Sequence, residues 1–300
     1  MFKDYYIDYL NYVEVLQKPQ SIRSLKERFD NIILPYFGSY NINSISKHDV
    51  IDFLSYLHQK KYSFNYIRNI FYLCSGFFNY LVSFDFIDSN VFRDVGFKLS
   101  NYKFRSKNFY TFKEFKLFIK YSSNPLYTLF FTFLFFTGVR PGEAFALKFS
   151  DLHSFSVKIN KTIDSHGSRD VSFCKTFSSY RTISIPFKLY FQLLLLKYFY
   201  ISKYGFSDFY IFGGIKPLSP TTINRYKFSV CFKAHLIPIT LHGFRHSHAT
   251  LLLDKGLSIE AISKRLGHSS SDITLRVYTH VTNKQEKRVL QTLNFLNFLV

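Results

Sequence analysis

The sequence predicts a two-domain protein that is mainly α-helical, with one small antiparallel β-sheet in its second half. The chain has 300 residues, and typical domains run to about 100–200 residues. Apolar residues recur at three- and four-residue steps through most of its length, which is the period of a helix. Only residues 154–186 alternate as strands do. Hydrophobic residues make up 47% of the chain, which supports a substantial core and excludes disorder through most of the length.

The first third predicts a small all-α module. Three serines precede segments with helical periodicity and are suited to cap helices: Ser21, Ser46 and Ser63. The helix that Ser21 starts is expected over residues 22–33, with Pro35 and Gly38 ending it. A short helix before Ser21 would complete the module.

A change of composition over residues 98–108 predicts a domain boundary. This stretch lacks apolar periodicity and is rich in basic residues, namely Lys98, Lys103, Arg105 and Lys107. Such a segment is a solvated linker, a basic strap against a phosphate backbone, or both. We therefore predict a helical domain over residues 1–100, a basic linker over 101–110 and a second domain over 111–300.

The second domain is expected to be helical around its sheet. Helices are predicted over residues 112–121 and 126–137. Residues 156–163 and 181–185 alternate as two antiparallel strands, with a turn at Gly167 between them. Helices resume at residue 187 and continue towards the end.

The charge balance points to a polyanionic partner. The chain carries 39 Lys plus Arg against 20 Asp plus Glu, a net charge of +19. This excess favours nucleic acid over an anionic membrane surface.

The cysteines and apolar runs favour a cytoplasmic protein. Cys74, Cys174 and Cys231 are far apart, odd in number and without C-x-x-C spacing. This pattern argues against a disulfide framework or a zinc site. The N-terminus has no apolar signal core, and no apolar run approaches the ~18–20 residues that span a bilayer. We therefore expect no membrane partner.

The segment Thr137-Gly-Val-Arg-Pro-Gly-Glu143 places a cation at a helix start. Gly138 is suited to end one helix and Pro141 to begin the next. Glu143 falls in the first turn, where the helix dipole favours an acid. Arg140 then lies beside unpaired backbone N–H groups, a position that suits a phosphate. The alternative is an ordinary surface arginine at a helix junction.

The segment Thr240-Leu-His-Gly-Phe-Arg-His246 combines an imidazole with a guanidinium. Thr240 can cap a helix whose first turns carry His242 and Arg245, three residues apart and hence on one face. The arginine can bind two oxygens of an oxyanion while the histidine transfers a proton. An alternative is a metal bound by His242 and His246, but no cysteine or carboxylate nearby completes a ligand set.

Two further segments carry side chains suited to chemistry. Lys175 opens the run Lys-Thr-Phe-Ser-Ser-Tyr-Arg-Thr-Ile-Ser-Ile-Pro, near the predicted turn between strands. His268 follows a helix that Ser258 starts and Gly267 ends, and Tyr278 lies ten residues further on. Each of these residues, taken singly, is equally compatible with a structural or solvated role.

Taken together, in this order and spacing, the four segments resemble the tyrosine recombinases of phage integrase type. T-G-V-R-P-G-E is similar to the family's first arginine box, and the segment after Lys175 to its β-hairpin lysine segment. H-G-F-R-H resembles the H-x-x-R box, and L-G-H-S-S followed by V-Y-T-H-V the box with the nucleophile. The resemblance covers about residues 20–290. One departure is Gly243-Phe244, where Asp/Gly-Leu is more usual.

The resemblance implies a SAM-like, all-α core-binding domain followed by an α+β catalytic domain. It implies a site-specific DNA recombinase, an integrase that inserts and excises a mobile element. Tyr278 would attack a DNA phosphodiester to form a 3′-phosphotyrosyl bond and free a 5′-hydroxyl. Because the bond energy is conserved, neither a cofactor nor a metal is required.

The remaining site residues take their roles from the same resemblance. Arg140 and Arg245 would hold the phosphate oxygens, and His268 would add a hydrogen bond. Lys175 would protonate the departing 5′ oxygen, and His242 would help to deprotonate the tyrosine. Glu143 would orient this cluster, its alternative role being ordinary helix capping.

The resemblance also implies partners. These are double-stranded DNA, a homo-tetramer on paired sites, and accessory DNA-bending or directionality proteins. The apolar stretch of residues 290–300 is expected either to dock on a neighbouring protomer or to pack on its own domain. Residues 1–20 are too few for the separate arm-binding domain of many phage integrases.

Several alternatives share parts of the pattern. A Xer-like resolution or inversion recombinase, and a type IB topoisomerase-like relaxing enzyme, would use the same chemistry. A non-catalytic regulator would use residues 249–254 and 259–266 as a helix-turn-helix around Gly256. A basic RNA-binding protein fits the charge, but the sequence carries no RRM-like or KH-like signature.

Overall fold

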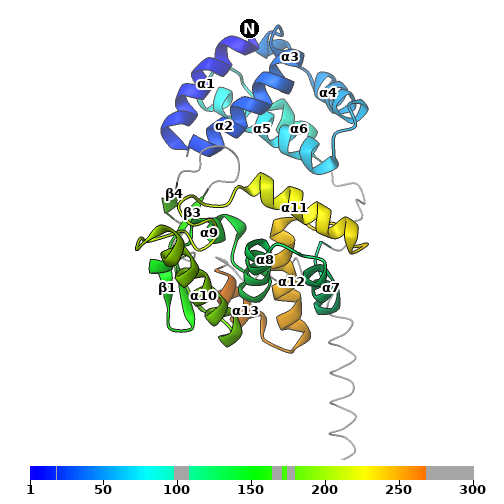
Figure 1. Ribbon diagram of the computed structural model, residues 1–300. Coiled ribbons are helices and arrows are strands. Elements are labelled where there is room, and N and C mark those ends of the chain that lie inside the picture. Colours follow the sequence, from blue (N-terminus) through cyan, green and yellow to red (C-terminus); the bar gives the residue numbers. More distant parts are fainter. Residues whose placement is uncertain (18, 98–107, 164–170, 174–179, 268–300) are drawn as a thin grey trace, which may run out of the picture. The chain divides into compact units, whose positions relative to one another are not determined.

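The computed structural model describes residues 1–17, 19–97, 108–163, 171–173 and 180–267. The chain divides into two compact units, Met1–Phe104 and Arg105–Val300. Residues 98–107, which include residues 101–107 of the predicted linker, lie outside the described residues. Figure 1 labels the helices α1–α13 and the strands β1, β3 and β4.

The described residues of the first unit are helical. Its α-helices are α1 (Phe2–Leu16), α2 (Pro19–Arg28), α3 (Leu34–Phe37), α4 (Lys47–Gln59), α5 (Phe64–Ser83) and α6 (Val91–Val95). A π-helical segment joins α2 to α3 at Phe29–Ile33, and a 3₁₀ turn precedes α4 at Ile42–Ser44. The all-α prediction for these residues is confirmed, and the helix before Ser21 is longer than expected.

Two of the three predicted caps are present. The Ser46 side chain accepts from the Asp49 N–H, and the Asp49 carboxylate accepts from the Ser46 N–H, which together form a capping box. The Ser63 hydroxyl accepts from the Tyr66 N–H at the start of α5. The apolar residues of α5 that recur at helical spacing are buried, and aromatic rings fill the core around them, with Phe2 and Phe77 centred 4.8 Å apart.

Of the prediction for the helix after Ser21, the start and the stop at Pro35 are wrong, whereas the end at Gly38 is confirmed. Helix α2 begins at Pro19, which tolerates a first-turn position because it has no N–H to donate there. Pro35 does not stop the helical path either. The chain widens into the π-helical segment, where the Leu34 N–H bonds the Phe29 carbonyl, and Pro35 then falls in the first turn of α3. A missing N–H is tolerated in a first turn, so the path continues to Phe37.

In the second unit, the described residues form mainly helices, with two small sheets. These helices are α7 (Phe112–Lys120), α8 (Pro125–Thr137), α9 (Pro141–Ala146), α10 (Phe187–Tyr204), α11 (Pro220–Lys233), α12 (Leu241–Asp254) and α13 (Ile259–Leu266), with a 3₁₀ turn at Phe149–Asp151. Its strands are β1 (Leu152–His153), β2 (Ser156–Ile159), β3 (Lys161–Ile163), β4 (Val171–Phe173) and β5 (Arg181–Ser184).

The sheets are antiparallel, as predicted, but the first predicted strand is two strands. β2 pairs with β1 and with β5, and Val157 lies opposite Ile183. After Asn160 the chain starts β3, which pairs with β4 in a separate two-stranded sheet. The alternation of apolar and polar residues stops at Asn160-Lys161-Thr162, which are all polar, and the change of strand falls at this point. The predicted turn at Gly167 lies outside the described residues.

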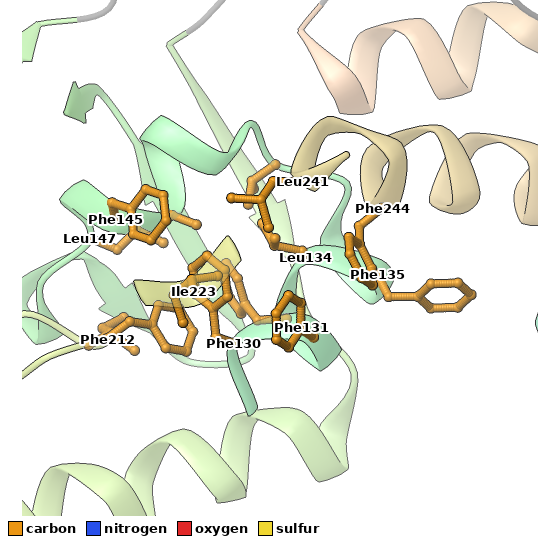
Figure 2. Packing of buried hydrophobic residues seen from close by; sticks show 14 of the residues in the cluster. Phe130, Phe131, Leu134, Phe135, Phe145, Leu147, Phe212, Ile223, Leu241 and Phe244 are labelled. Carbon is orange, nitrogen blue, oxygen red and sulfur yellow. The ribbon is translucent and has the colours of Figure 1, made fainter. Parts of the chain in front are cut away.

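Helix α8 runs through the core of this unit. Phe130, Phe131 and Leu134 are fully buried and contact residues of α9, α11 and α12, as Figure 2 shows. α8 and α12 pack side by side. This packing fixes the end of α8, where the first predicted site segment begins.

Two further observations concern the described residues alone. Cys74 and Cys231 are buried free thiols, and Cys174 lies outside that part of the chain. Among the helices that the structure describes, none combines the length and apolar character that a membrane crossing requires.

Gly138, which ends α8, should tolerate no side chain. Its φ is +67°, and a Cβ there would lie 2.5 Å from Cδ2 of His248 and 2.7 Å from Cδ2 of Leu266. Gly138→Ala should lower the free energy of unfolding by ~3 kcal/mol or more, since overpacking adds to the left-handed strain. Gly256→Ala is the matched control, because φ is +87° with nothing within 4 Å, and should lose only ~1–2 kcal/mol. If chemical denaturation gave the same loss of unfolding free energy for both variants, the close packing around Gly138 would be contradicted.

Candidate active site

Arg140 occupies the junction between α8 and α9, as predicted. Gly138 caps α8 in the left-handed conformation, and Pro141 opens α9. Arg140 is the extended N-cap residue between them, and its side chain is 36% exposed. The guanidinium therefore reaches solvent while its backbone is fixed at a helix start.

Glu143 is the buried anion at this junction. Its carboxylate is 2% exposed and accepts from the Arg140 N–H at 2.8 Å and from Arg140 Nη1 at 3.0 Å. It also accepts from Nη1 and Nη2 of Arg181, at 3.0 and 2.7 Å. Burial alone would raise the pKa of Glu143, but the bonds from Arg181 and then Arg140 outweigh it and hold the pKa below its usual value.

Helix α12 brings Arg245 to the same junction. Thr240 caps the helix by accepting from the Gly243 N–H at 2.9 Å. Arg245 is 2% exposed and donates from Nη1 to the carbonyl of Gly138 at 2.9 Å. Arg245 is thus bonded to the backbone two residues before Arg140.

His242 lies one turn before Arg245 and is exposed. Its ring meets that of His246 edge to face, with centroids 4.8 Å apart. Burial, and then the charge of Arg245, lower the pKa of His246. Among the described residues there is no group of three or more His, Cys, Asp or Glu side chains suited to hold a metal.

The start of α12 is held by Asn108, which lies within the predicted linker of residues 101–110. The Asn108 side chain accepts from the Thr240 N–H at 3.0 Å and donates to the Thr240 hydroxyl at 3.1 Å. A Cβ on Gly243 would lie 2.8 Å from the Asn108 carbonyl oxygen. This close approach explains why glycine stands at the first position of the Gly243-Phe244 departure.

The C-terminal end of α13 supplies two further acceptors. The helix ends at Gly267, whose φ of +69° is left-handed. The Gly267 carbonyl accepts from Arg140 Nη2 at 3.1 Å, and the Arg265 carbonyl accepts from Arg181 Nε at 3.1 Å. The last carbonyls of a helix carry partial negative charge, so they stabilise the two guanidiniums that meet them.

A buried histidine links this helix end to α8. The Nδ1 of His248 bonds the Phe135 carbonyl at 2.9 Å, and Nε2 accepts from Arg265 Nε at 3.0 Å. These partners assign the neutral tautomer with its proton on Nδ1. Burial, followed by the charge of Arg265, lowers the pKa of His248 to about 3.

The structure brings together part of the predicted site. Arg140 and Arg245 meet at one chain junction, with Glu143 bonded to the first of them. Lys175, His268 and Tyr278 lie outside the described residues.

Sequence reasoning missed three residues of this cluster, namely Arg181, His248 and Arg265. Arg181 stands in the segment that Lys175 opens, but its partner Glu143 is distant in sequence. His248 and Arg265 carry no local signal of burial, so only the tertiary structure reveals their contact.

Comparison with known proteins adds independent findings. Residues 108–285 match the model of the phage integrase family, and residues 1–58 match its N-terminal SAM-like domain. The ICEBs1 integrase of Bacillus subtilis (strain 168) is 31% identical over 310 residues, which cover 96% of this chain and 81% of that protein. The integrase of Staphylococcus phage L54a is 30% identical over 53% of this chain and 49% of its own length.

Solved structures share the fold. The Tn1549 transposon integrase, in complex with transposon right end DNA, matches with a TM-score of 0.81 and 19% identity over 97% of this chain and 98% of that chain. A lambda integrase dimer bound to a COC′ core site matches with a TM-score of 0.71 and 17% identity, over 91% of this chain and 94% of that chain. These matches and the SAM-like model confirm the predicted fold class.

His248 should make the second unit sensitive to mild acid. Its pKa rises from about 3 in the folded state to the ordinary value of 6.5 on unfolding. Its contribution to stability is therefore complete above pH 6.5 and is lost as the pH falls towards 3, by ~1.4 kcal/mol per pH unit. The lowered pKa of His246 acts in the same direction, and Glu143 adds to the loss only at lower pH.

The measurement is the free energy of unfolding between pH 6.5 and 5 for the wild type, His248→Gln and His246→Gln. His248→Gln should reduce the slope more than the less buried His246→Gln. An unchanged slope in His248→Gln would show that this histidine is not buried in its neutral form.

Proposed function

The chain belongs to the phage integrase family of tyrosine recombinases, and we propose that it is the integrase of a mobile element, cleaving and rejoining duplex DNA through a 3′-phosphotyrosyl intermediate. The observation that carries the mechanism is the meeting of Arg140 and Arg245 at the junction of α8 and α9. Two relatives of this chain are named as integrases, one of ICEBs1 and one of a phage, and these names favour integration over resolution or inversion as its function.

Phosphate binding falls to the two arginines. The bonds of the Arg140 guanidinium to Glu143 and to Gly267 occupy two of its five N–H donors. Donors remain on a side chain that is 36% exposed. Together with Arg245, it would hold the two non-bridging oxygens as negative charge grows on the pentavalent phosphorus.

Glu143 makes this arrangement possible. It orients Arg140 through one guanidinium nitrogen, and its shared bonds with Arg181 keep it ionised. The carboxylate thereby positions Arg140 and does not itself contact the DNA.

Proton transfers fall to the remaining predicted residues. The hydroxyl of Tyr278, with an ordinary pKa near ~10, would lose its proton with help from His242 as it attacks the phosphorus. Lys175 would donate a proton to the departing 5′ oxygen, and His268 would donate a hydrogen bond to the phosphate. The bond from phosphorus to the 5′ oxygen breaks as the bond to tyrosine forms. Attack by a partner strand's 5′-hydroxyl reverses the step, so the balance needs no cofactor.

The helix-turn-helix alternative accounts for less of the structure. α12 begins at Leu241 and not at residue 249, and α13 follows it after a turn at Gly256. A regulator that only binds DNA has no need of a buried carboxylate and two arginines arranged around one chain junction. The family match leads us to the enzyme.

Double-stranded DNA is the partner that this family implies, and the net charge of +19 suits it. Affinity should fall steeply with salt as counterions are released. For the domain organisation we propose a core-binding domain at residues 1–100, a basic linker at 101–110 and a catalytic domain at 111–300. We also infer a homo-tetramer on paired sites, accessory DNA-bending or directionality proteins, and action in the cytoplasm.

Replacing the nucleophile should separate binding from cleavage. Tyr278→Phe removes only the hydroxyl, so it should bind its DNA with unchanged affinity and form no covalent complex on a suicide duplex. The measurement is the fraction of DNA that denaturing gel electrophoresis retains with the protein. Cleavage by Tyr278→Phe would assign the nucleophile elsewhere. Relaxation of a plasmid without a recombination site would favour a topoisomerase.

The two arginines should not be replaceable by lysine. Arg140→Lys keeps the charge but loses the planar fork, so single-turnover cleavage should slow by about 100-fold or more while binding changes little. Lys113→Gln serves as the control, because Lys113 is an exposed residue of α7 and its replacement removes a charge outside the site. Cleavage by Arg140→Lys at the wild-type rate would remove this arginine from the site.

A further inference from the structure

Arg265 binds three separate elements from the last turn of α13. Its Nε donates to His248 of α12 at 3.0 Å. Its Nη2 donates to the Ser184 carbonyl of β5 at 3.0 Å and to the Phe136 carbonyl of α8 at 3.3 Å. One guanidinium therefore fixes the end of α13 against both helices and the sheet.

The acceptors of this guanidinium are neutral. Two are backbone carbonyls, and the third is the neutral imidazole of His248. Its Nδ1 proton is donated to the Phe135 carbonyl, so Nε2 carries no proton and accepts from Arg265. Arg265 is half-buried, and a cation that is partly removed from water among neutral acceptors gains less than one paired with a carboxylate, while desolvation still costs free energy. Stability alone is therefore a poor explanation for an arginine here.

The backbone that Arg265 fixes is the one that holds the other arginines. Its own carbonyl accepts from Arg181, and the Gly267 carbonyl, two residues on, accepts from Arg140. Arg140 has Glu143 as its other bonded partner in the described structure. Its orientation thus depends on one acceptor from its own helix and one from α13.

We propose that Arg265 is a positioning residue that holds the end of α13 in place and thereby orients the guanidinium of Arg140 towards the phosphate. The proposal rests on the proposed function, since the orientation of Arg140 matters to the reaction only if the protein cleaves DNA. Arg265 itself is not assigned a contact with the substrate.

Docking of α13 does not depend on this arginine. Ile262 and Leu266 are buried against Ala249 and Leu253 of α12 in an apolar cluster. This contact should keep α13 folded on its neighbour when Arg265 is replaced. What is lost is the fixed direction of the last carbonyls, so the effect should appear in the rate of cleavage and not in DNA affinity.

Lys264 provides a matched control. It lies in the same helical turn, carries the same charge and is exposed. Lys264→Gln thus removes one positive charge from the end of α13 without touching the bonds to His248, Ser184 or Phe136.

The experiment measures single-turnover cleavage of a suicide duplex, DNA affinity and melting temperature. The variants are Arg265→Gln, Lys264→Gln, Arg140→Lys and the double variant of the first and third. Arg265→Gln should slow cleavage at least about tenfold with affinity within about twofold, and Lys264→Gln should cleave at the wild-type rate. In the Arg140→Lys background, Arg265→Gln should slow cleavage less than about threefold further, because the group it positions has already been replaced.

Other outcomes overturn the proposal. Wild-type cleavage by Arg265→Gln, or losses that multiply in the double variant, would show that Arg265 does not act through Arg140. If Arg265→Gln does not fold, Arg265→Met is measured in the same way, and failure of both to fold would make Arg265 a structural residue. Absence of covalent product from the wild type would remove the proposed function instead, so the two failures are distinguishable.

Discussion

The carboxylate of Glu143 is the constraint on which the described site depends. It is buried at the first turn of α9 and shared by two guanidiniums, those of Arg140 and Arg181. A buried anion is stable only when its oxygens are bonded and its charge is compensated. Glu143 therefore ties the sheet to the junction of α8 and α9, and it leaves Arg140 partly exposed in one orientation.

Backbone carbonyls also hold the arginines of the site in place. Gly138 and Gly267 both end helices in the left-handed conformation, and their carbonyls accept from Arg245 and Arg140 respectively. Carbonyls hold a guanidinium without neutralising it, so the positive charge stays available to an incoming phosphate. The same principle extends to Arg265, which bonds two carbonyls and a neutral imidazole. A site for a polyanion can thus be built with a single buried carboxylate among its described residues.

Features that depend on residues close together in the sequence were predictable, and contacts between distant segments were not. Caps such as Ser46 depend on residues three positions apart, and the left-handed end at Gly138 depends on glycine itself, so both were predicted correctly. The change of sheet partner after Asn160 was missed, because the polar run Asn160-Lys161-Thr162 does not show which strand each half of residues 156–163 pairs with. The motifs placed Arg140 in the site, but the contacts of Arg265 join segments that only the fold brings together.

The most direct test of the account is the chemical identity of the link between protein and DNA. A suicide duplex would be trapped with the wild-type protein, digested with protease and nuclease, and the modified peptide sequenced by mass spectrometry. The account predicts a 3′-phosphonucleotide on the phenolic oxygen of Tyr278. A nucleotide on any other side chain, or cleaved DNA without a covalent peptide, would contradict it.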